Sequence, residues 1–478
     1  MEYRLYIDGQ FKDPAAGGTI GVRAPALGKE FTTVAYGTRE DARLAVEAAV
    51  AAFPAWRKTN VYERAGYINR IADLMRERAD SIGEALTREN GKPLAESKGE
   101  VMGAAATLDW SAEVARHHYG QWIASHTNDK RLLTLRSPIG VTAAIAPWNF
   151  PVMLICRKLG PALAVGCTVV CRAASQTPRS VMELFNCVHD SGLPAGAANL
   201  ITGSPSEQSD EFLENSEVKK ISFTGSVEVG KTIMKKAAGQ LKKLSLELGG
   251  HSPFIVCEDA DIKRAADVAV KGKFRNMGQS CIAPSRFFVP TSMADEFTEE
   301  VVRLASALKL GNGMDADTEV GPLIDDMRLA ATEAIVDDVI KNGGKVLCGG
   351  KRPPGDACSG GSFYEPTVVS GVTDDMLIMK EEPFAPVLPI IPYDDLDEAV
   401  ARANDVPYGL AAYMVTNDMR TMFKLGEELD SGVIAVNDFA PAAPQAPFGG
   451  TKESGLGREG SWQVLEAYTE TKFMSIVL

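Results

Sequence analysis

The feature that most constrains the fold of this chain is an alternation of short apolar runs with amphipathic stretches that begins at residue 139. The apolar runs have the length of buried strands, and the stretches between them have the apolar spacing of helices. This pattern indicates βαβ units, which build a parallel sheet covered by helices. A similar alternation follows residue 285, so we expect two α/β domains. The runs include "IGVTAAIAP", "CTVVCRA", "AANLITG", "KKISFTG" and "KKLSLEL", and later "RFFVP", "KVLCGG" and "SGVIAVND".

Composition limits the classes of function. The 478 residues exceed the ~250–300 at which a single core stops growing. A net charge of −13 argues against an extended nucleic-acid surface, and no apolar run is long enough to span a bilayer. The first residues, "MEYRLYIDGQF", lack the basic and apolar segments of a signal peptide. We therefore expect a cytoplasmic protein with no nucleic-acid or membrane partner.

The cysteines and histidines argue against a metal site. The eight cysteines form no C-x-x-C pair and mostly lie in apolar runs, which favours reduced, buried thiols. None of the five histidines stands at zinc-ligand spacing from a cysteine or an acid, so we expect no metal. Cys281, in "FRNMGQSCIAPS", differs from the others because small polar residues precede it and a proline follows. It is either a nucleophile or one more packed thiol.

Three further stretches carry candidate chemistry. "APWNFP" closes an apolar strand and puts the amide of Asn149 where open α/β sheets bind ligands, although a rigid turn is the alternative. "FTGSVEVG" ends a strand with Gly225 and Ser226 and opens a helix whose free N–H groups suit a phosphate. A plain N-cap by Ser226 is the alternative there. "LELGG" places Glu247 in an apolar strand, and buried glutamates are scarce unless paired or functional.

These stretches, with "GQSC", "EEPFAPV" and "APFGGTKESGLGRE", make the chain resemble the aldehyde dehydrogenase superfamily over essentially its whole length. "CRKLGPALAVGCTVV", "ASQTP" and "KFRNMGQSC" are most similar to the bacterial succinate-semialdehyde dehydrogenases. The resemblance implies an α/β fold with a Rossmann-type cofactor domain, an α/β catalytic domain and a small β oligomerisation region. The implied ranges are 1–118 and 139–247, with 437–458 returning, for the cofactor domain, 248–436 for the catalytic domain, and 119–138 and 459–478 for the oligomerisation strands.

The resemblance also implies roles for the candidate residues. Cys281, as a thiolate, attacks the aldehyde carbon, and loss of hydride to the nicotinamide then gives a thioester. The amide of Asn149 and the backbone N–H of Cys281 form an oxyanion hole. Glu247 activates the water that hydrolyses the thioester, and burial is expected to raise its pKa toward the working range. On this basis Cys281 reacts and the other cysteines pack.

Further residues follow from the same resemblance. The implied cofactor is NADP by preference, with NAD as an alternative, and the implied substrate is a short aldehyde with an anionic far end, first of all succinic semialdehyde. The implied cofactor-binding residues are Pro147, Trp148, Arg172, Ser175, Gly225, Ser226, Gly230, Leu248, Glu382 and Phe384. The implied substrate-binding residues are Arg157, Arg275, Phe150 and Glu459.

Two departures from the family pattern affect specificity. Many members have Lys-Pro-x-Glu where this chain reads "RAAS" from Arg172 to Ser175. Without that glutamate no negative charge repels the 2′-phosphate of NADP, and the planar guanidinium of Arg172 is suited to bind it. The alternative is that Arg172 only covers the edge of the adenine ring. The loop "FAPAAPQAPFGG" replaces a serine-containing loop of the relatives. Glutaric semialdehyde and sulfonated or phosphonated aldehydes are therefore alternative substrates. For Arg275 the alternative to substrate binding is a structural ion pair.

Assembly and two other functions complete the expectations. Residues 119–138 and the end "YTETKFMSIVL" resemble the strands with which these proteins build dimers, and an unpaired apolar edge favours pairing, so we expect a homodimer or homotetramer. A CoA-acylating dehydrogenase is disfavoured by the presence of Glu247. A non-catalytic binding protein of the same fold is disfavoured because Cys281, Asn149 and Glu247 are retained together.

Overall fold

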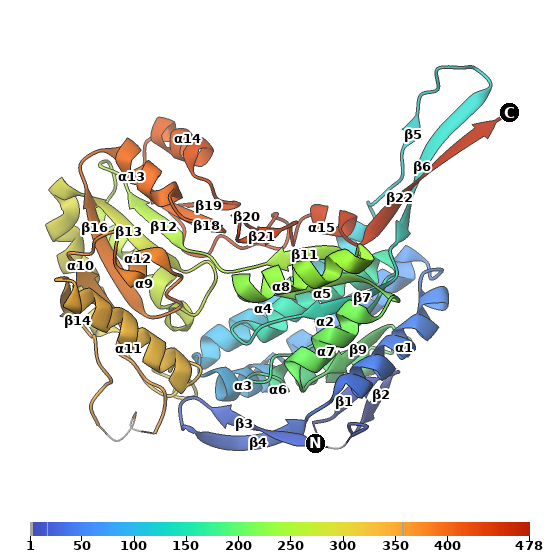
Figure 1. Cartoon of the computed structure of the whole chain (residues 1–478), viewed down its shortest axis with the longest axis horizontal. Coiled ribbons are helices and arrows are strands. Elements are labelled where there is room, and N and C mark those ends of the chain that lie inside the picture. Colours follow the sequence, from blue (N-terminus) through green and yellow to red (C-terminus); the bar gives the residue numbers. More distant parts are fainter. Residues whose placement is uncertain (1–2, 17, 356–357, 359) are drawn as a thin grey trace.

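The computed structural model describes residues 3–16, 18–355, 358 and 360–478. Two α/β bodies lie side by side, and a three-stranded arm that includes the C-terminal strand projects from one of them (Figure 1). Each body is built around one large sheet, so the two expected α/β domains are confirmed as two sheets with their own cores. Within the described ranges, no helix is both long and apolar enough to cross a membrane.

The first sheet contains the five apolar runs that begin at residue 139. They pair in parallel in the order β9-β8-β7-β10-β11. From β7 the chain adds β8 and β9 on one side and then β10 and β11 on the other, so the strand order reverses between β7 and β10. In open α/β sheets ligands bind beyond the carboxyl ends of the strands at such a reversal. The full sheet, in spatial order, is β2 Gln10–Lys12, β1 Leu5–Ile7, β9 Ala198–Ile201, β8 Thr168–Arg172, β7 Val141–Ile145, β10 Val218–Thr224, β11 Lys243–Glu247 and β21 Gly455–Leu456.

Helices cover both faces of this sheet because alternate residues of its strands point to opposite sides. Along β7, Val141, Ala143 and Ile145 pack with one set of helices, and Ala144 packs with the other. The first set is α1 Arg39–Trp56, α7 Pro205–Glu214 and α8 Val227–Ala237. The second set is α2 Val61–Glu77, α3 Ala79–Asn90, α4 Leu94–Ala115, α5 Pro151–Val165 and α6 Arg179–Asp190.

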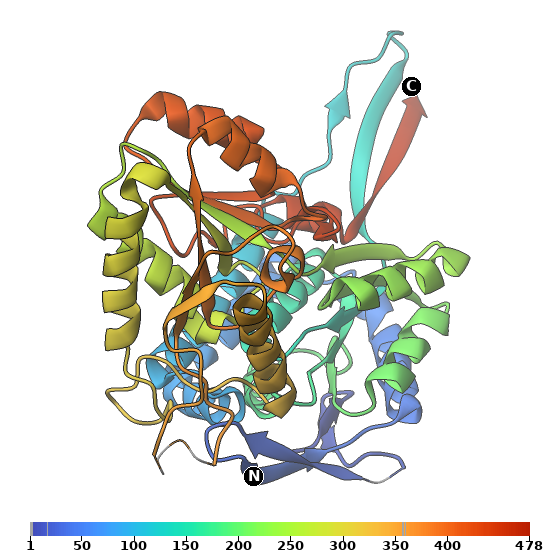
Figure 2. The ribbon, with the colours of Figure 1, turned by 60° about the vertical axis from the view of Figure 1, so that its left-hand side comes forward.

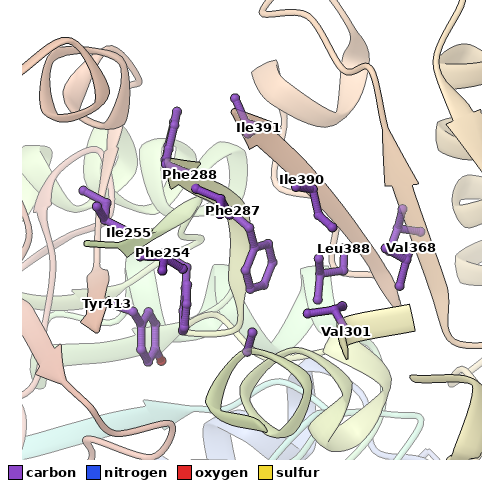
Figure 3. Packing of buried hydrophobic residues seen from close by; sticks show 14 of the residues in the cluster. Phe254, Ile255, Phe287, Phe288, Val301, Val368, Leu388, Ile390, Ile391 and Tyr413 are labelled. Atoms are coloured by element: carbon purple, nitrogen blue, oxygen red, sulfur yellow. The ribbon is translucent and has the colours of Figure 1, made fainter. Parts of the chain in front are cut away.

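The second body has a mostly parallel sheet with an aromatic centre. The rings of Phe254, Phe287 and Tyr413 lie next to one another on neighbouring strands (Figure 3). Its strands, in spatial order, are β14 Lys345–Cys348, β15 Thr367–Ser370, β16 Val387–Tyr393, β13 Pro284–Pro290, β12 Ser252–Val256, β18 Ala411–Val415 and β19 Val433–Val436. Its helices are α9 Ile262–Phe274, α10 Ala294–Ala307, α11 Asp326–Lys341, α12 Leu377–Lys380, α13 Leu396–Asn404 and α14 Met419–Glu428.

The arm stands clear of both bodies (Figure 2). Its long strands pair antiparallel along their whole length, and it exposes the large apolar side chains of Trp122, Phe473 and Val477. The arm consists of β5 Trp122–Ile123, β6 Lys130–Pro138 and β22 Thr469–Val477. The remaining elements are the ribbon of β3 Thr19–Ala24 with β4 Lys29–Ala35, the pair β17 Tyr408–Gly409 with β20 Thr451–Lys452, and α15 Gln463–Glu466.

The chain passes between the bodies more than once. β19 forms the edge of the second sheet, and β21 then returns to pair with β11 of the first. This return brings residues near 450 against the carboxyl end of β11, where Glu247 lies. The exact domain ranges stay a prediction.

Candidate active site

Cys281 lies between two cavities at the junction of the bodies. One cavity, of about 280 Å³, is lined by Cys281 and Asn149 together with Arg157 and Arg275. The other, of about 250 Å³, is lined by the same Cys281 and Asn149 together with residues at the carboxyl ends of β7, β10 and β11. A thiol shared by two cavities can meet a different molecule on each side. Five other cysteines are buried, as expected, namely Cys156, Cys167, Cys171, Cys187 and Cys257, whereas Cys348 and Cys358 are only partly buried.

Asn149 is held beside the loop that carries Cys281. Its amide Nδ2 donates to the carbonyl of Gln279 over 3.1 Å, and its side chain is almost fully buried. The carbonyl of Asn149 accepts from Lys92 Nζ over 2.6 Å. An amide fixed at both its backbone and its side chain is suited to stabilise negative charge that develops nearby.

Lys92 belongs to a buried ion pair under Asn149. Lys92 Nζ lies 2.8 Å from Glu100 Oε2, and both side chains are excluded from solvent. Glu100 Oε1 accepts the backbone N–H groups of Val152 and Met153 in the first turn of α5. A carboxylate at a helix N-terminus is favoured by the helix dipole, so this pair anchors the start of α5 and the loop before it.

Glu247 is the last residue of β11, and its buried carboxylate has few hydrogen-bond donors around it. Its Oε2 has no hydrogen-bond partner among the described residues. A Cβ added at Gly449 would lie 2.6 Å from Glu247 Oε1, so the chain must have glycine there for the carboxylate to fit. Burial, and then the negative charge of Glu459, raise the pKa of Glu247 well above its ordinary value, while Lys158 and Arg157 oppose the shift. A carboxyl with a raised pKa can exchange a proton near neutrality.

Glu459 lies against Lys158 rather than in the cavity with Arg157 and Arg275. Lys158 Nζ donates to Glu459 Oε1, and to Thr224 Oγ1 over 2.7 Å. Glu459 Oε2 has no partner among the described residues. The cavity lining includes Arg157, Arg275 and Phe150 of the four predicted substrate residues, but not Glu459.

The two arginines of this cavity rest on aromatic rings. The Arg157 guanidinium lies 4.2 Å from the ring centroid of Phe448, and that of Arg275 lies 5.3 Å from that of Phe150. Within the described part of the chain neither guanidinium has a hydrogen-bond or ion-pair acceptor. For Arg275 the nearest acidic influence is Glu96, whose burial-raised pKa the charge of Arg275 lowers, but no ion pair between them lies within 4 Å. Rings hold the two cations in place and leave their N–H groups available.

The predicted cofactor residues gather on the other side of Cys281. A further cavity of about 470 Å³ continues from the 250 Å³ one toward α7 and α8. Ser226 is the N-cap of α8, since its side chain accepts from Val229 N over 3.4 Å, and it lines the cavity as well. Gly230 is the exception, because it lines neither cavity and packs under Leu248. The predicted residues that line these two cavities are Pro147, Trp148, Arg172, Ser175, Gly225, Ser226, Leu248, Glu382 and Phe384.

The far end of the larger cavity offers positive and neutral donors. Arg172 Nη2 donates weakly to Gly203 O over 3.3 Å, and its Nε is buried without a partner in the described chain. Burial lowers the pKa of Arg172 to about 10. Ser175 Oγ donates to the same carbonyl over 3.4 Å. An arginine with an unfilled donor in a long cavity fits a dinucleotide with a charged far end.

Near Cys281 the cavity is bordered by a second buried carboxylate. Glu382 Oε1 accepts the N–H of Gly250 over 3.0 Å, and burial raises the pKa of Glu382 to about 7. Burial, and then the charges of Glu382 and Glu247, raise the pKa of the Cys281 thiol to about 12, while Arg157 opposes the shift. A thiol with a pKa raised in this way needs added positive charge or a base beside it to react as a thiolate.

Comparison with known proteins gives the family. The sequence profile described as "Aldehyde dehydrogenase family" matches residues 11–474. A glutarate-semialdehyde dehydrogenase of Pseudomonas putida is 44% identical over 99% of this chain and 97% of its own length. An NADP-dependent succinate-semialdehyde dehydrogenase of Escherichia coli is 43% identical over 99% and 97%. A crystal structure of an Escherichia coli NADP-dependent enzyme superposes with a TM-score of 0.98 at 42% identity, covering 100% of this chain and 98% of that one.

These matches confirm the predicted fold and the predicted class of enzyme, an oxidoreductase whose family uses a nicotinamide dinucleotide. The chain belongs to the aldehyde dehydrogenase family.

Proposed function

We propose that this protein oxidises a short aldehyde with an anionic far end, with succinic semialdehyde to succinate as the leading reaction. The observation that carries the proposal is the pair of acceptor-free guanidinium groups, Arg157 and Arg275, in a cavity of about 280 Å³ that also contains Cys281. A buried anion requires such donors, and its aldehyde end would then meet the thiol.

The chemistry divides among three side chains. The Cys281 thiolate adds to the aldehyde carbon, and the Asn149 amide and the Cys281 N–H donate to the oxygen that gains charge. A nicotinamide dinucleotide held by the residues that line the adjoining cavity, among them Trp148, Glu382 and Phe384, would supply positive charge beside the thiol and the acceptor for the hydride. The product is a thioester on Cys281. Glu247 then takes a proton from a water that attacks the thioester, which releases the carboxylate and regenerates the thiolate.

For the cofactor we propose a preference for NADP over NAD. Arg172 and Ser175 line the far end of the larger cavity, and no acid stands at position 175 to repel a 2′-phosphate. Ser175→Glu is expected to swing kcat/KM toward NAD. Equal or better use of NAD by the wild type contradicts this proposal.

The test of the substrate compares succinic semialdehyde with butyraldehyde, which has the same number of carbons but no charge. Each charge-assisted hydrogen bond lost in Arg157→Gln or Arg275→Gln is worth ~1.5–3 kcal/mol, or roughly 10- to 150-fold in kcat/KM for the anionic aldehyde. Butyraldehyde should be little affected, and the exposed Arg352→Gln serves as control. Equal use of both aldehydes by the wild type overturns the proposal.

The length and type of the anion can be resolved in the same assay. Ala440, Ala442 and Pro444 of the loop "FAPAAPQAPFGG" line the cavity and offer no side-chain donor. Glutaric semialdehyde and sulfonated or phosphonated aldehydes are therefore the alternatives to include. The highest kcat/KM among them identifies the anion that the two arginines accept best.

We also propose that the protein assembles as a homodimer or homotetramer through the arm. Trp122, Phe473 and Val477 are each more than half exposed on β5 and β22, and burial of such side chains favours association. Light scattering at micromolar concentration should give at least the mass of a dimer. A monomer contradicts the proposal.

A further inference from the structure

The turn that leads to Cys281 has left-handed backbone at three consecutive residues. The φ angles are 46° at Asn276, 56° at Met277 and 70° at Gly278. Left-handed backbone is unfavourable for residues that carry a Cβ, and runs of it are rare. At Gly278 a Cβ would lie 2.4 Å from the carbonyl of Ala385, so only glycine fits. Asn276 and Met277 must be held in place by their surroundings, in which both are buried.

The side chain of Asn276 joins two loops of the active site. Its Nδ2 donates to the carbonyl of Asn149 over 3.2 Å and to the carbonyl of Gln279 over 3.3 Å. The carbonyl of Gln279 also accepts from Asn149 Nδ2 over 3.1 Å. Asn276, Asn149 and Gln279 therefore form a closed ring of hydrogen bonds between the loop after β7 and the loop before Cys281.

The backbone of Asn276 is anchored as well. Its N–H donates to Glu96 Oε2 of α4 over 3.1 Å. Its carbonyl accepts from the backbone N–H of Gln279 over 3.0 Å and from Gln279 Nε2 over 3.1 Å. Gln279 Oε1 in turn accepts from the N–H of Ile324 over 2.9 Å. Contacts from three separate segments thus hold the turn in its unfavourable conformation.

We propose that Asn276 is a positioning residue that fixes the separation between the Asn149 amide and the backbone N–H of Cys281. This inference rests on the proposed function, in which those two donors receive the aldehyde oxygen. Loss of the Asn276 amide weakens stabilisation of that oxygen and leaves the thiol itself accessible. Small displacements of preorganised donors are costly for catalysis.

The test uses Asn276→Gly, which keeps the left-handed backbone and removes the amide. The burst of reduced cofactor with aldehyde is expected to slow by about 10- to 100-fold, which is less than the ~10²–10³ found for outright loss of an oxyanion donor, because here the donors are displaced and not removed. Asn276→Asp keeps the shape and the left-handed preference but cannot donate, and is expected to lose as much. The matched control is Asn437→Gly, because Asn437 also has a left-handed φ of 56° and donates its amide to a backbone carbonyl, that of Thr416. The control should keep the burst within about threefold.

A second readout separates the oxyanion donors from the thiol. Methyl methanethiosulfonate is attacked at sulfur, with a sulfinate as leaving group, so its reaction with Cys281 needs no oxyanion hole. Labelling of Cys281 should stay within about threefold in Asn276→Gly. A normal burst in either folded Asn276 variant, or an equal loss of burst and labelling, overturns the proposal. A wild type that gives no burst with any aldehyde instead contradicts the proposed function.

Discussion

Two buried lysine–glutamate pairs flank the active site, and their carboxylates are satisfied to different degrees. In the pair under Asn149, both oxygens of Glu100 have donors, Oε2 from Lys92 and Oε1 from two backbone N–H groups of α5. In the pair beside Glu247, Lys158 contacts only Oε1 of Glu459, and Oε2 has no partner in the described chain. Glu247 Oε2 is equally unfilled.

This difference in hydrogen bonding indicates a structural role for Glu100 and a role in proton transfer for Glu247. A buried carboxylate with both oxygens hydrogen-bonded is held in one position. This suits Glu100, because Lys92 also holds the carbonyl of Asn149. A carboxylate with an empty acceptor can take up a proton at little further cost. This suits Glu247, whose pKa is raised well above its ordinary value by burial and then by the charge of Glu459, while Lys158 opposes the shift.

The largest expected effect is at Glu247. Glu247→Gln should reduce steady-state turnover by ~10²–10⁴, the range of general-base catalysis, and leave the first burst of reduced cofactor intact. Stopped-flow and steady-state rates on one preparation measure both. If the burst slows as much as turnover, Glu247 acts on the thiol and not on the water.

The next effect concerns stability and contrasts the two lysines. Lys92→Met removes the cation from the buried carboxylate of Glu100, which two backbone N–H groups of α5 still hold in place, and should cost ~3–5 kcal/mol of unfolding free energy in urea. Lys158→Met should cost less, because only one oxygen of Glu459 is bonded among the described side chains and the carboxylate can turn to a new partner. Equal losses for the two variants would remove the distinction between the pairs.

Two variants are expected to shift the pH dependence of turnover in opposite directions. Glu247 must be deprotonated to act as a base, so the rate of thioester hydrolysis should rise with pH through the raised pKa of Glu247. This rise is the rising limb of the pH–rate profile. Glu459→Gln removes a negative neighbour and should move that limb to lower pH, whereas Lys158→Met removes a positive one and should move it higher, each by about one unit. Shifts in the same direction, or none, indicate that another group controls the limb.

The smallest effect is a pH-dependent change in stability. The pKa of Glu247 is raised on folding, so its stabilising contribution is complete below its unfolded pKa and is lost as pH rises through the folded value. Glu247→Gln removes this loss. Its unfolding free energy should exceed that of the wild type at pH 9 by on the order of 1 kcal/mol, and the gap should close toward pH 5. A difference in unfolding free energy between Glu247→Gln and the wild type that does not change with pH would contradict a raised pKa for Glu247.

Much of the fold follows from local patterns. Strands β7 to β11 are short apolar runs separated by helical stretches, and such a pattern leaves few arrangements other than a parallel sheet. Cys281, Asn149 and Glu247 could be found for a similar reason. Each lies at the end of a strand or in a short motif that is readable without knowledge of its neighbours.

The supporting groups could not be found in that way. Lys158 and Glu459 are far apart in sequence, and their contact exists only because the chain returns to the first sheet. The left-handed turn at Asn276 likewise depends on contacts with other segments. One signal was present, since Lys158 and Arg157 are the two charged residues of the mostly apolar helix "PVMLICRKLGPALAV", and a buried charge needs a partner.

The central claim is that Cys281 forms a thioester with the aldehyde carbon and that Glu247 activates the water that hydrolyses this thioester. The most direct test mixes Glu247→Gln with succinic semialdehyde and NADP⁺, quenches the reaction in acid after the burst, and maps the adduct by peptide mass spectrometry. A succinyl group should be found on the peptide with Cys281, at close to one per active site, and on no other cysteine. The absence of that adduct after a full burst, or its presence on another cysteine, would contradict the account.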